Sequence, residues 1–138
     1  MGLLFARAKG VLNLAVALVV EDEWLVRMEI AEALDACGWT VVEASSAEAA
    51  LAMLDHNPAV DLVVTDIRLP GPATGWDVAD AFRAANPKVA VIYCSGNPCE
   101  PERQLPDSMF LSKPCRMDRL VEASRKLCAA APAGKRAE

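Results

Sequence analysis

The sequence predicts an α/β fold in which a doubly wound, five-stranded parallel sheet has the strand order 2-1-3-4-5. From about residue 14 to residue 130, short apolar runs alternate with stretches whose apolar residues recur at helical spacing. The runs are almost continuously apolar, which is typical of parallel strands that helices cover on both faces. Because no repeat and no second alternating pattern is found, we expect one domain over residues 14–130.

The apolar run at residues 15–20 predicts the first strand. Arg7 and Lys9 precede it, as in a secretory signal peptide, but acidic residues 21–23 follow where a small-residue cleavage site would lie. The run is also too short to cross a bilayer, which needs about 20 residues. We therefore expect no membrane insertion and interpret residues 1–13 as an N-terminal extension.

The first helix is predicted over residues 23–37, and Gly38 ends it. Its apolar residues form one stripe at helical spacing: Val26, Ile30, Ala33, Leu34 and Cys37. Residues 40–42 read as a short second strand. Ser45 and Glu48 have the spacing of a capping box, which predicts the start of a second helix that ends before a proline.

The third strand is predicted at residues 62–65 and is followed by a loop rich in proline and glycine at residues 69–75. Residues 76–85 then predict a helix that an Asn-Pro pair closes. The fourth strand, residues 89–94, is almost entirely apolar. It is therefore expected to lie centrally, with both faces covered.

The next connection departs from the pattern, because residues 96–107 contain three prolines. Prolines inside a helix remove hydrogen bonds and clash with the preceding turn, so we expect at most one turn, at residues 100–104. The last strand is predicted at residues 109–111 and the last helix at residues 117–130. Residues 131–138 are interpreted as a short C-terminal tail.

The composition excludes some classes of function. A net charge of −5 and a pI near 4.9 leave no overall basic surface for nucleic acid. The local basic residues of the last helix are interpreted as a solvated face: Arg116, Arg119, Arg125 and Lys126. The five cysteines are odd in number and lack zinc-ligand spacing, so we expect buried, reduced thiols in a cytoplasmic protein.

Polar residues follow four of the five predicted strands at the point where each strand ends. Because the carboxyl ends of parallel strands meet at one edge of the sheet, where ligands bind, these side chains are expected to converge. They are two acids after the first strand, an aspartate after the third, a hydroxyl after the fourth and a lysine after the fifth: Glu21, Asp22, Asp66, Ser95 and Lys113.

This set of residues suits phosphoryl transfer. Asp66, expected to be exposed, can attack phosphorus and form an acyl phosphate. Glu21 and Asp22 offer the oxygen ligands that Mg²⁺ prefers, and the cation would neutralise the two anions that must meet. Lys113 and Ser95 would supply a positive charge and a hydroxyl donor to the transferring group. Taken singly, each residue has an ordinary role at a turn or a helix start; the combination predicts the site.

The same segments resemble the receiver domain of bacterial two-component response regulators. The resemblance covers residues 15–130 and rests on four motifs: LVVEDE at residues 18–23, VTDIRLPG at 64–71, VIYCSG at 91–96 and FLSKP at 110–114. It implies a flavodoxin-like receiver fold, here with an irregular fourth helix. The chain differs from the usual pattern in that irregular helix and in a slightly longer loop after Asp66.

The resemblance also implies roles for the site residues. Asp66 would accept a phosphoryl group from a histidine kinase or a histidine phosphotransfer protein. Mg²⁺ would be held by Glu21, Asp22, Asp66 and the backbone carbonyl of Arg68. Phosphorylation would draw Ser95 toward the phosphoryl group and turn Phe110 inward, which changes the surface offered to a partner protein.

Several functions stay open at this stage. The leading one is a stand-alone response regulator, not a dedicated enzyme, that acts on an unidentified protein. A phosphoryl shuttle in a phosphorelay, an inert interaction module and a homodimer are alternatives. A phosphatase of the haloacid dehalogenase type would need a second aspartate two residues after the nucleophile, where Arg68 stands and cannot act as an acid. No direct contact with nucleic acid is expected.

Overall fold

The computed structural model describes residues 15–56 and 59–130. The expected extension at residues 1–13 and the tail at residues 131–138 lie outside the described residues. The five strands form one sheet of order β2-β1-β3-β4-β5, and every pairing is parallel, as predicted. The strands are β1 (Val16–Val20), β2 (Thr40–Ala44), β3 (Leu62–Asp66), β4 (Ala90–Ser95) and β5 (Ser108–Ser112).

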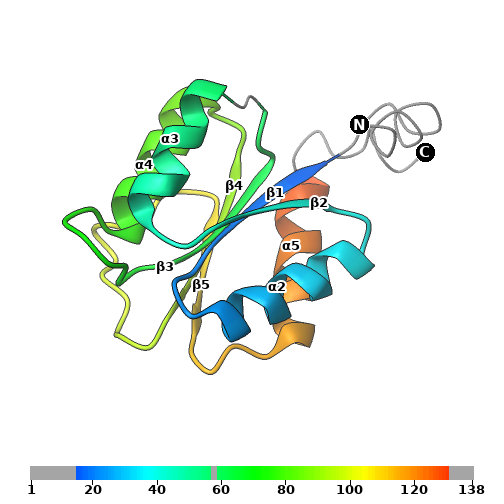
Figure 1. The fold of residues 1–138 in the computed structure, drawn as a ribbon. Helices are drawn as coiled ribbons and strands as arrows, with labels where there is room; N and C mark the ends of the chain where they lie inside the picture. Colours follow the sequence, from blue (N-terminus) through cyan, green and yellow to red (C-terminus); the bar gives the residue numbers. More distant parts are fainter. Residues whose placement is uncertain (1–14, 57–58, 131–138) are drawn as a thin grey trace.

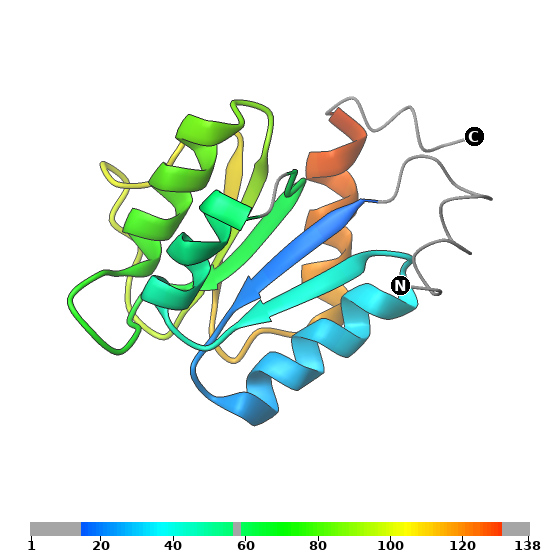
Figure 2. The ribbon, with the colours of Figure 1, turned by 45° about the horizontal axis from the view of Figure 1, so that its top comes forward.

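Two layers of helices enclose the sheet. One face carries α3 (Ala47–His56) and α4 (Gly75–Ala85), and the other carries α2 (Trp24–Ala36) and α5 (Met117–Ala130) (Figure 1). The turned view separates the two layers clearly (Figure 2). Each face has its own apolar core, and β4 is buried along its whole length, as its apolar sequence predicts.

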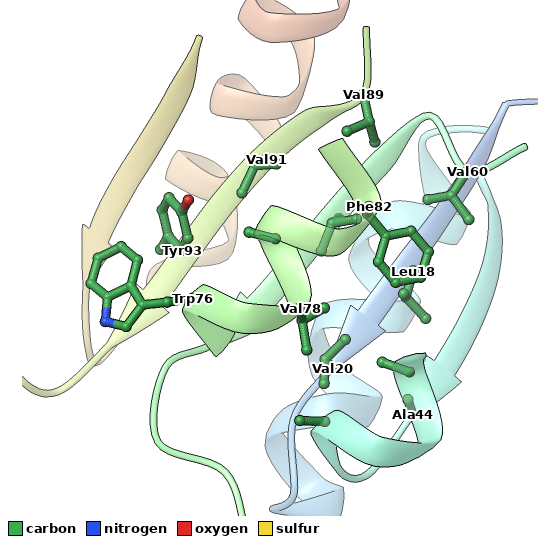
Figure 3. Packing of buried hydrophobic residues seen from close by; sticks show 14 of the residues in the cluster. Leu18, Val20, Ala44, Val60, Trp76, Val78, Phe82, Val89, Val91 and Tyr93 are labelled. Carbon is green, nitrogen blue, oxygen red and sulfur yellow. The ribbon is translucent and has the colours of Figure 1, made fainter. Parts of the chain in front are cut away.

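The core beneath α4 contains a group of three aromatic residues: Trp76, Tyr93 and Phe110. Trp76 and Tyr93 are buried, with ring centroids 4.7 Å apart, and lie beside each other in Figure 3. Phe110 packs on both rings, at 6.4 Å from Trp76 and 6.3 Å from Tyr93. Aromatic pairs prefer offset or edge-to-face arrangements, so these contacts favour one relative orientation of the three rings.

The helix ends follow from local chemistry that the sequence only partly predicts. Gly38 has a φ of +99°, a conformation that glycine adopts without strain, and it ends α2 as predicted. The prediction that Cys37 belongs to the buried stripe of this helix is wrong. The helix ends at Ala36, and the side chain of Cys37 is exposed. At the start of α3 the hydroxyl of Ser46, not of Ser45, accepts the N–H of Ala49.

The connection between β4 and β5 contains no helix, in agreement with its three prolines. It has a single turn, in which the N–H of Arg103 donates to the carbonyl of Glu100 over 2.8 Å. The hydroxyl of Tyr93 accepts the N–H of Leu105 over 3.3 Å, which fastens this connection to the sheet. An irregular segment therefore stands where the resemblance implies a fourth helix, as the prolines predict.

The remaining expectations concern the surface and the thiols. The described basic residues of the last helix region are exposed: Arg116, Arg119, Arg125 and Lys126. None of the five cysteines is in a disulfide, and the expectation of buried thiols holds fully only for Cys94. In the part of the chain that the structure describes, no helix combines the length and apolar character that a membrane crossing requires.

Candidate functional site

The carboxyl ends of β1, β3, β4 and β5 bring the predicted residues to one edge of the sheet. Strand register sets their order: Val20 lies opposite Thr65, Asp66 opposite Cys94, and Ser95 opposite Ser112. Glu21, Asp66, Ser95 and Lys113 therefore stand at neighbouring strand ends, as the pattern of polar residues predicts.

Lys113 connects two of these strand ends directly. Its Nζ donates to Oε1 of Glu21 over 3.0 Å and to Oδ2 of Asp66 over 3.0 Å. Both carboxylates are largely removed from solvent, with side-chain exposures of 1% and 10%. Burial opposes the charge of Lys113, but the two hydrogen bonds and the two negative charges together raise its pKa above the ordinary value. The ammonium is thus a fixed positive charge at neutral pH.

The fold buries the carboxylate of Glu21 and provides a hydrogen-bond donor for each of its two oxygens. Burial raises its pKa above the ordinary value, against the opposing effect of the hydrogen bond from Lys113. The N–H of Glu23 donates to Oε2 over 3.1 Å. Arg27 holds the preceding backbone in place, because its Nη1 donates to the carbonyl of Glu21 and its Nε to Glu43.

Asp66 is less exposed than the sequence suggests. It was expected to project from the edge of the sheet, but only 8% of its surface is accessible. One oxygen, Oδ1, accepts the N–H of Ile67 over 2.7 Å, and the other accepts Lys113. The following loop returns over the strand end, since the N–H of Gly75 donates to the carbonyl of Ile67. The carboxylate is therefore held in one orientation from two sides.

Three carboxylates form a compact group at this edge. One oxygen from each of Glu21, Asp22 and Asp66 lies within 4.8 Å of the others. Asp22 is exposed, whereas Glu21 and Asp66 are buried. Oxygen donors at this spacing, with one side open for water, fit a hard divalent cation such as Mg²⁺, which retains several waters. Lys113 neutralises only part of the charge of the three acids.

The other residues named from the sequence lie at the margin of this group. The hydroxyl of Ser95 is buried and accepts the N–H of Asn97 over 3.0 Å. Phe110 is half-buried in the aromatic group with Trp76 and Tyr93, on β5, which β4 separates from the strand that carries Asp66. Arg68 is exposed in the loop after β3.

Sequence reasoning missed two contributors to the site. Gly75 opens α4 directly against the backbone of Asp66, and nothing but a glycine after a turn-rich loop signals this. The capping box that positions α4 is formed by Thr74 and Asp77, whose side chains and backbone N–H groups bond reciprocally. A Thr-x-x-Asp pattern before a helix could have indicated it.

The buried ion pair between Lys113 and Glu21 leads to a prediction about stability. Lys113→Met should lower the free energy of unfolding by about 2–3 kcal/mol at pH 7, because buried Glu21 loses the partner that opposes its desolvation. Without Lys113 the pKa of Glu21 rises further in the folded state, so the deficit grows as the pH increases above about 4 and nearly vanishes at lower pH.

Urea unfolding of the wild type and the variant at pH 4 and pH 7 measures this effect. Lys88→Met serves as the control, because Lys88 is exposed and lies just before β4, at the edge of the sheet opposite to the acids. A loss of stability that is equal at both pH values would contradict the electrostatic explanation and indicate lost packing.

Comparison with known proteins agrees with the observed fold. The model of the response regulator receiver domain matches residues 17–125. Sensor kinase CckA of Brucella abortus is 33% identical over 118 residues, which cover 82% of this chain and 12% of CckA. The C4-dicarboxylate transport transcriptional regulatory protein DctD of Rhizobium meliloti is 30% identical over 112 residues, which cover 78% of this chain and 24% of DctD. The chain thus spans less than a quarter of each of these relatives.

Solved structures match over nearly their whole length. A response regulator receiver protein from Sinorhizobium medicae has a TM-score of 0.82 at 33% identity, over 86% of this chain and 98% of that one. The receiver domain of the hybrid histidine kinase CckA has a TM-score of 0.71 at 30% identity, over 82% of this chain and 98% of that one.

Proposed function

Since the chain belongs to the family of response regulator receiver domains, we propose that it accepts a phosphoryl group on Asp66 with the help of Mg²⁺ and thereby changes its binding to a partner protein. One observation carries the proposal: the Lys113 ammonium lies between two buried carboxylates, 3.0 Å from each, beside an acidic group that fits a divalent cation. Three carboxylates against one ammonium leave an excess of negative charge, which a divalent cation would neutralise.

The residues have distinct tasks in the proposed reaction. A carboxylate oxygen of Asp66 attacks phosphorus, the new O–P bond forms, and the bond from phosphorus to the donor's imidazole nitrogen or carboxylate oxygen breaks. The N–H of Ile67 and Lys113 orient the attacking carboxylate. Glu21, Asp22, Asp66 and the carbonyl of Arg68 would hold Mg²⁺, which supplies positive charge to the phosphoryl oxygens. Lys113 stabilises the same charge from another side.

A protein is the proposed source of the phosphoryl group, either a histidine kinase or a histidine phosphotransfer protein. The first two turns of α2, which follow the acids in the chain, expose three large apolar side chains: Trp24 at 61%, Leu25 at 60% and Met28 at 39%. Exposed apolar residues that lie together are a feature of surfaces that bind other proteins. Such a contact would bring a partner's phosphohistidine to the edge where Asp66 lies.

The proposed response runs from Ser95 to the irregular connection between β4 and β5. On phosphorylation the Ser95 hydroxyl would leave the N–H of Asn97 and bond to the phosphoryl group. Phe110 would then move against Tyr93, whose hydroxyl holds Leu105 in that connection. Because the segment has only one turn of its own, a small rearrangement there changes the surface that a partner binds.

A small-molecule phosphodonor tests the proposal without knowledge of the kinase. Incubation with acetyl phosphate and Mg²⁺ should add one phosphoryl group per chain in an intact-mass measurement, and chelation of the metal should prevent it. Beryllofluoride, which imitates the phosphoryl group, should bind in the same conditions. If neither acetyl phosphate nor beryllofluoride reacts in the presence of Mg²⁺, the phosphorylation proposal is wrong.

Asp22→Asn should separate the role of the metal from that of the fold. In the absence of Mg²⁺ the variant should be more stable than the wild type by about 1 kcal/mol, because one of three clustered like charges is removed. Mg²⁺ should raise the melting temperature of the wild type through binding to the folded state. The variant should lose most of that increase, and Glu32→Gln on the exposed side of α2 should keep it. An unchanged Mg²⁺ response in Asp22→Asn would exclude Asp22 as a ligand.

A further inference from the structure

Two thiols lie in contact beside the site and have no part in the proposed phosphoryl transfer. The Sγ atoms of Cys94 and Cys115 are 2.9 Å apart. We propose that Cys94 and Cys115 form a redox modification site, in which a peroxide converts the two thiols into a reversible disulfide. The inference is independent of phosphorylation, because it concerns the sulfur atoms alone.

The geometry brings together residues that are remote in the sequence. Cys94 is in β4 and is 1% exposed, whereas Cys115 is half-buried in the connection between β5 and α5. Because a disulfide bond is about 2.05 Å long, the sulfurs need to approach by roughly 0.9 Å. Cys115 lies in a connection outside regular secondary structure, so a shift of that size does not disturb the sheet.

An oxidant can reach the pair from solvent. A cleft of about 360 Å³ opens between α2 and the start of α5, and both cysteines line it together with Val26, Lys113 and Met117. A peroxide molecule is far smaller than this volume. The hydrogen bond between the two sulfurs lowers the pKa of the Cys115 thiol against the opposing effect of burial, and the nearby ammonium of Lys113 lowers it further. Exposure and chemistry both favour Cys115 as the first sulfur to react.

The proposed reaction balances with a peroxide as its oxidant. The Cys115 thiolate attacks one peroxide oxygen, the O–O bond breaks, and Cys115 becomes a sulfenic acid while hydroxide leaves and is protonated to water. The Cys94 thiol then attacks the Cys115 sulfur, and the S–O bond breaks. The proton of Cys94 leaves with that oxygen as a second water. Two thiols and one hydrogen peroxide thus give one disulfide and two waters, and thiol–disulfide exchange restores the thiols.

The bond would form within the framework of the candidate site. Cys94 directly precedes Ser95 and lies opposite Asp66 in the sheet, and Cys115 follows Lys113 by two residues. A disulfide would therefore join β4 to the segment that carries Lys113. This placement distinguishes the pair from Cys37, which is exposed on the far end of α2.

Hydrogen peroxide added to the fully reduced chain tests the proposal. After oxidation, the chain is denatured so that buried thiols become accessible, the remaining thiols are blocked with N-ethylmaleimide, and the number of blocked cysteines is read from the intact mass. The wild type should fall from five blocked cysteines to three, and a reductant should restore five. Digestion of the oxidised wild type without reduction should yield one crosslinked peptide pair that contains Cys94 and Cys115.

Variants with matched cysteine counts complete the test. Cys37→Ser should still lose two blocked cysteines, whereas Cys115→Ser should lose none and Cys94→Ser should form no crosslink. The crosslinked peptide comes from the wild type, so this result does not depend on whether the Cys94 variant folds. If peroxide leaves Cys94 and Cys115 blocked as free thiols, or if the crosslink joins any other pair, the proposal is overturned.

Discussion

Replacement of Asp66 by asparagine is expected to abolish phosphoryl labelling by acetyl phosphate. The amide oxygen of asparagine carries no full negative charge and is a much weaker nucleophile, so no O–P bond should form. The change preserves the size of the side chain, and the amide oxygen of asparagine can still accept the N–H of Ile67. The expected result is one phosphoryl group on the wild type and none on Asp66→Asn in the intact mass.

A second aspartate controls for labelling elsewhere on the chain. Asp55 is exposed in α3, on the helix layer opposite to α2, and Asp55→Asn should be labelled as fully as the wild type. Circular dichroism should show that both variants keep the secondary structure of the wild type. Full labelling of Asp66→Asn would mean that another residue accepts the phosphoryl group, and the proposed function would then fail.

Much of the fold and the residues of the site could be predicted because strand ends carry strong signals. Apolar runs that stop at Glu21, Asp66, Ser95 and Lys113 fix which edge of a parallel sheet these side chains share. The prolines of residues 96–107 likewise exclude a regular helix from composition alone. Both inferences need only local chemistry and the order of the strands.

The features that could not be predicted depend on contacts between residues that are distant in the sequence. Asp66 was expected to be exposed because a loop follows it, but that loop returns and Gly75 covers the strand end. The contact between Cys94 and Cys115 depends on how the connection after β5 passes the end of β4, which no spacing of cysteines encodes. The burial of Asp66 and the contact between two cysteines 21 residues apart arise only when the chain has packed.

Replacement of Gly75 by alanine is expected to be the most disruptive single change near the site. A Cβ at this position would overlap the carbonyl oxygen of Asp66 and would lie 2.8 Å from its carbonyl carbon and 2.9 Å from the Cα of Ile67. These are backbone atoms, so no side chain can turn away to relieve the overlap. We expect a loss of about 3 kcal/mol or more in the free energy of unfolding, at the upper end for an overpacked core.

The same overlap should reduce phosphoryl labelling in whatever fraction of Gly75→Ala folds, because the backbone that must move is that of Asp66. Gly96→Ala is the matched control: nothing lies within 4 Å of a Cβ built there, although Gly96 directly follows Ser95 at the same edge of the sheet. Its stability should change by no more than about 0.5 kcal/mol, as is usual for an exposed substitution. Urea unfolding and acetyl phosphate labelling measured on both variants separate the two effects. A Gly75→Ala chain as stable and as readily labelled as Gly96→Ala would show that α4 does not approach Asp66 as closely as the structure has it.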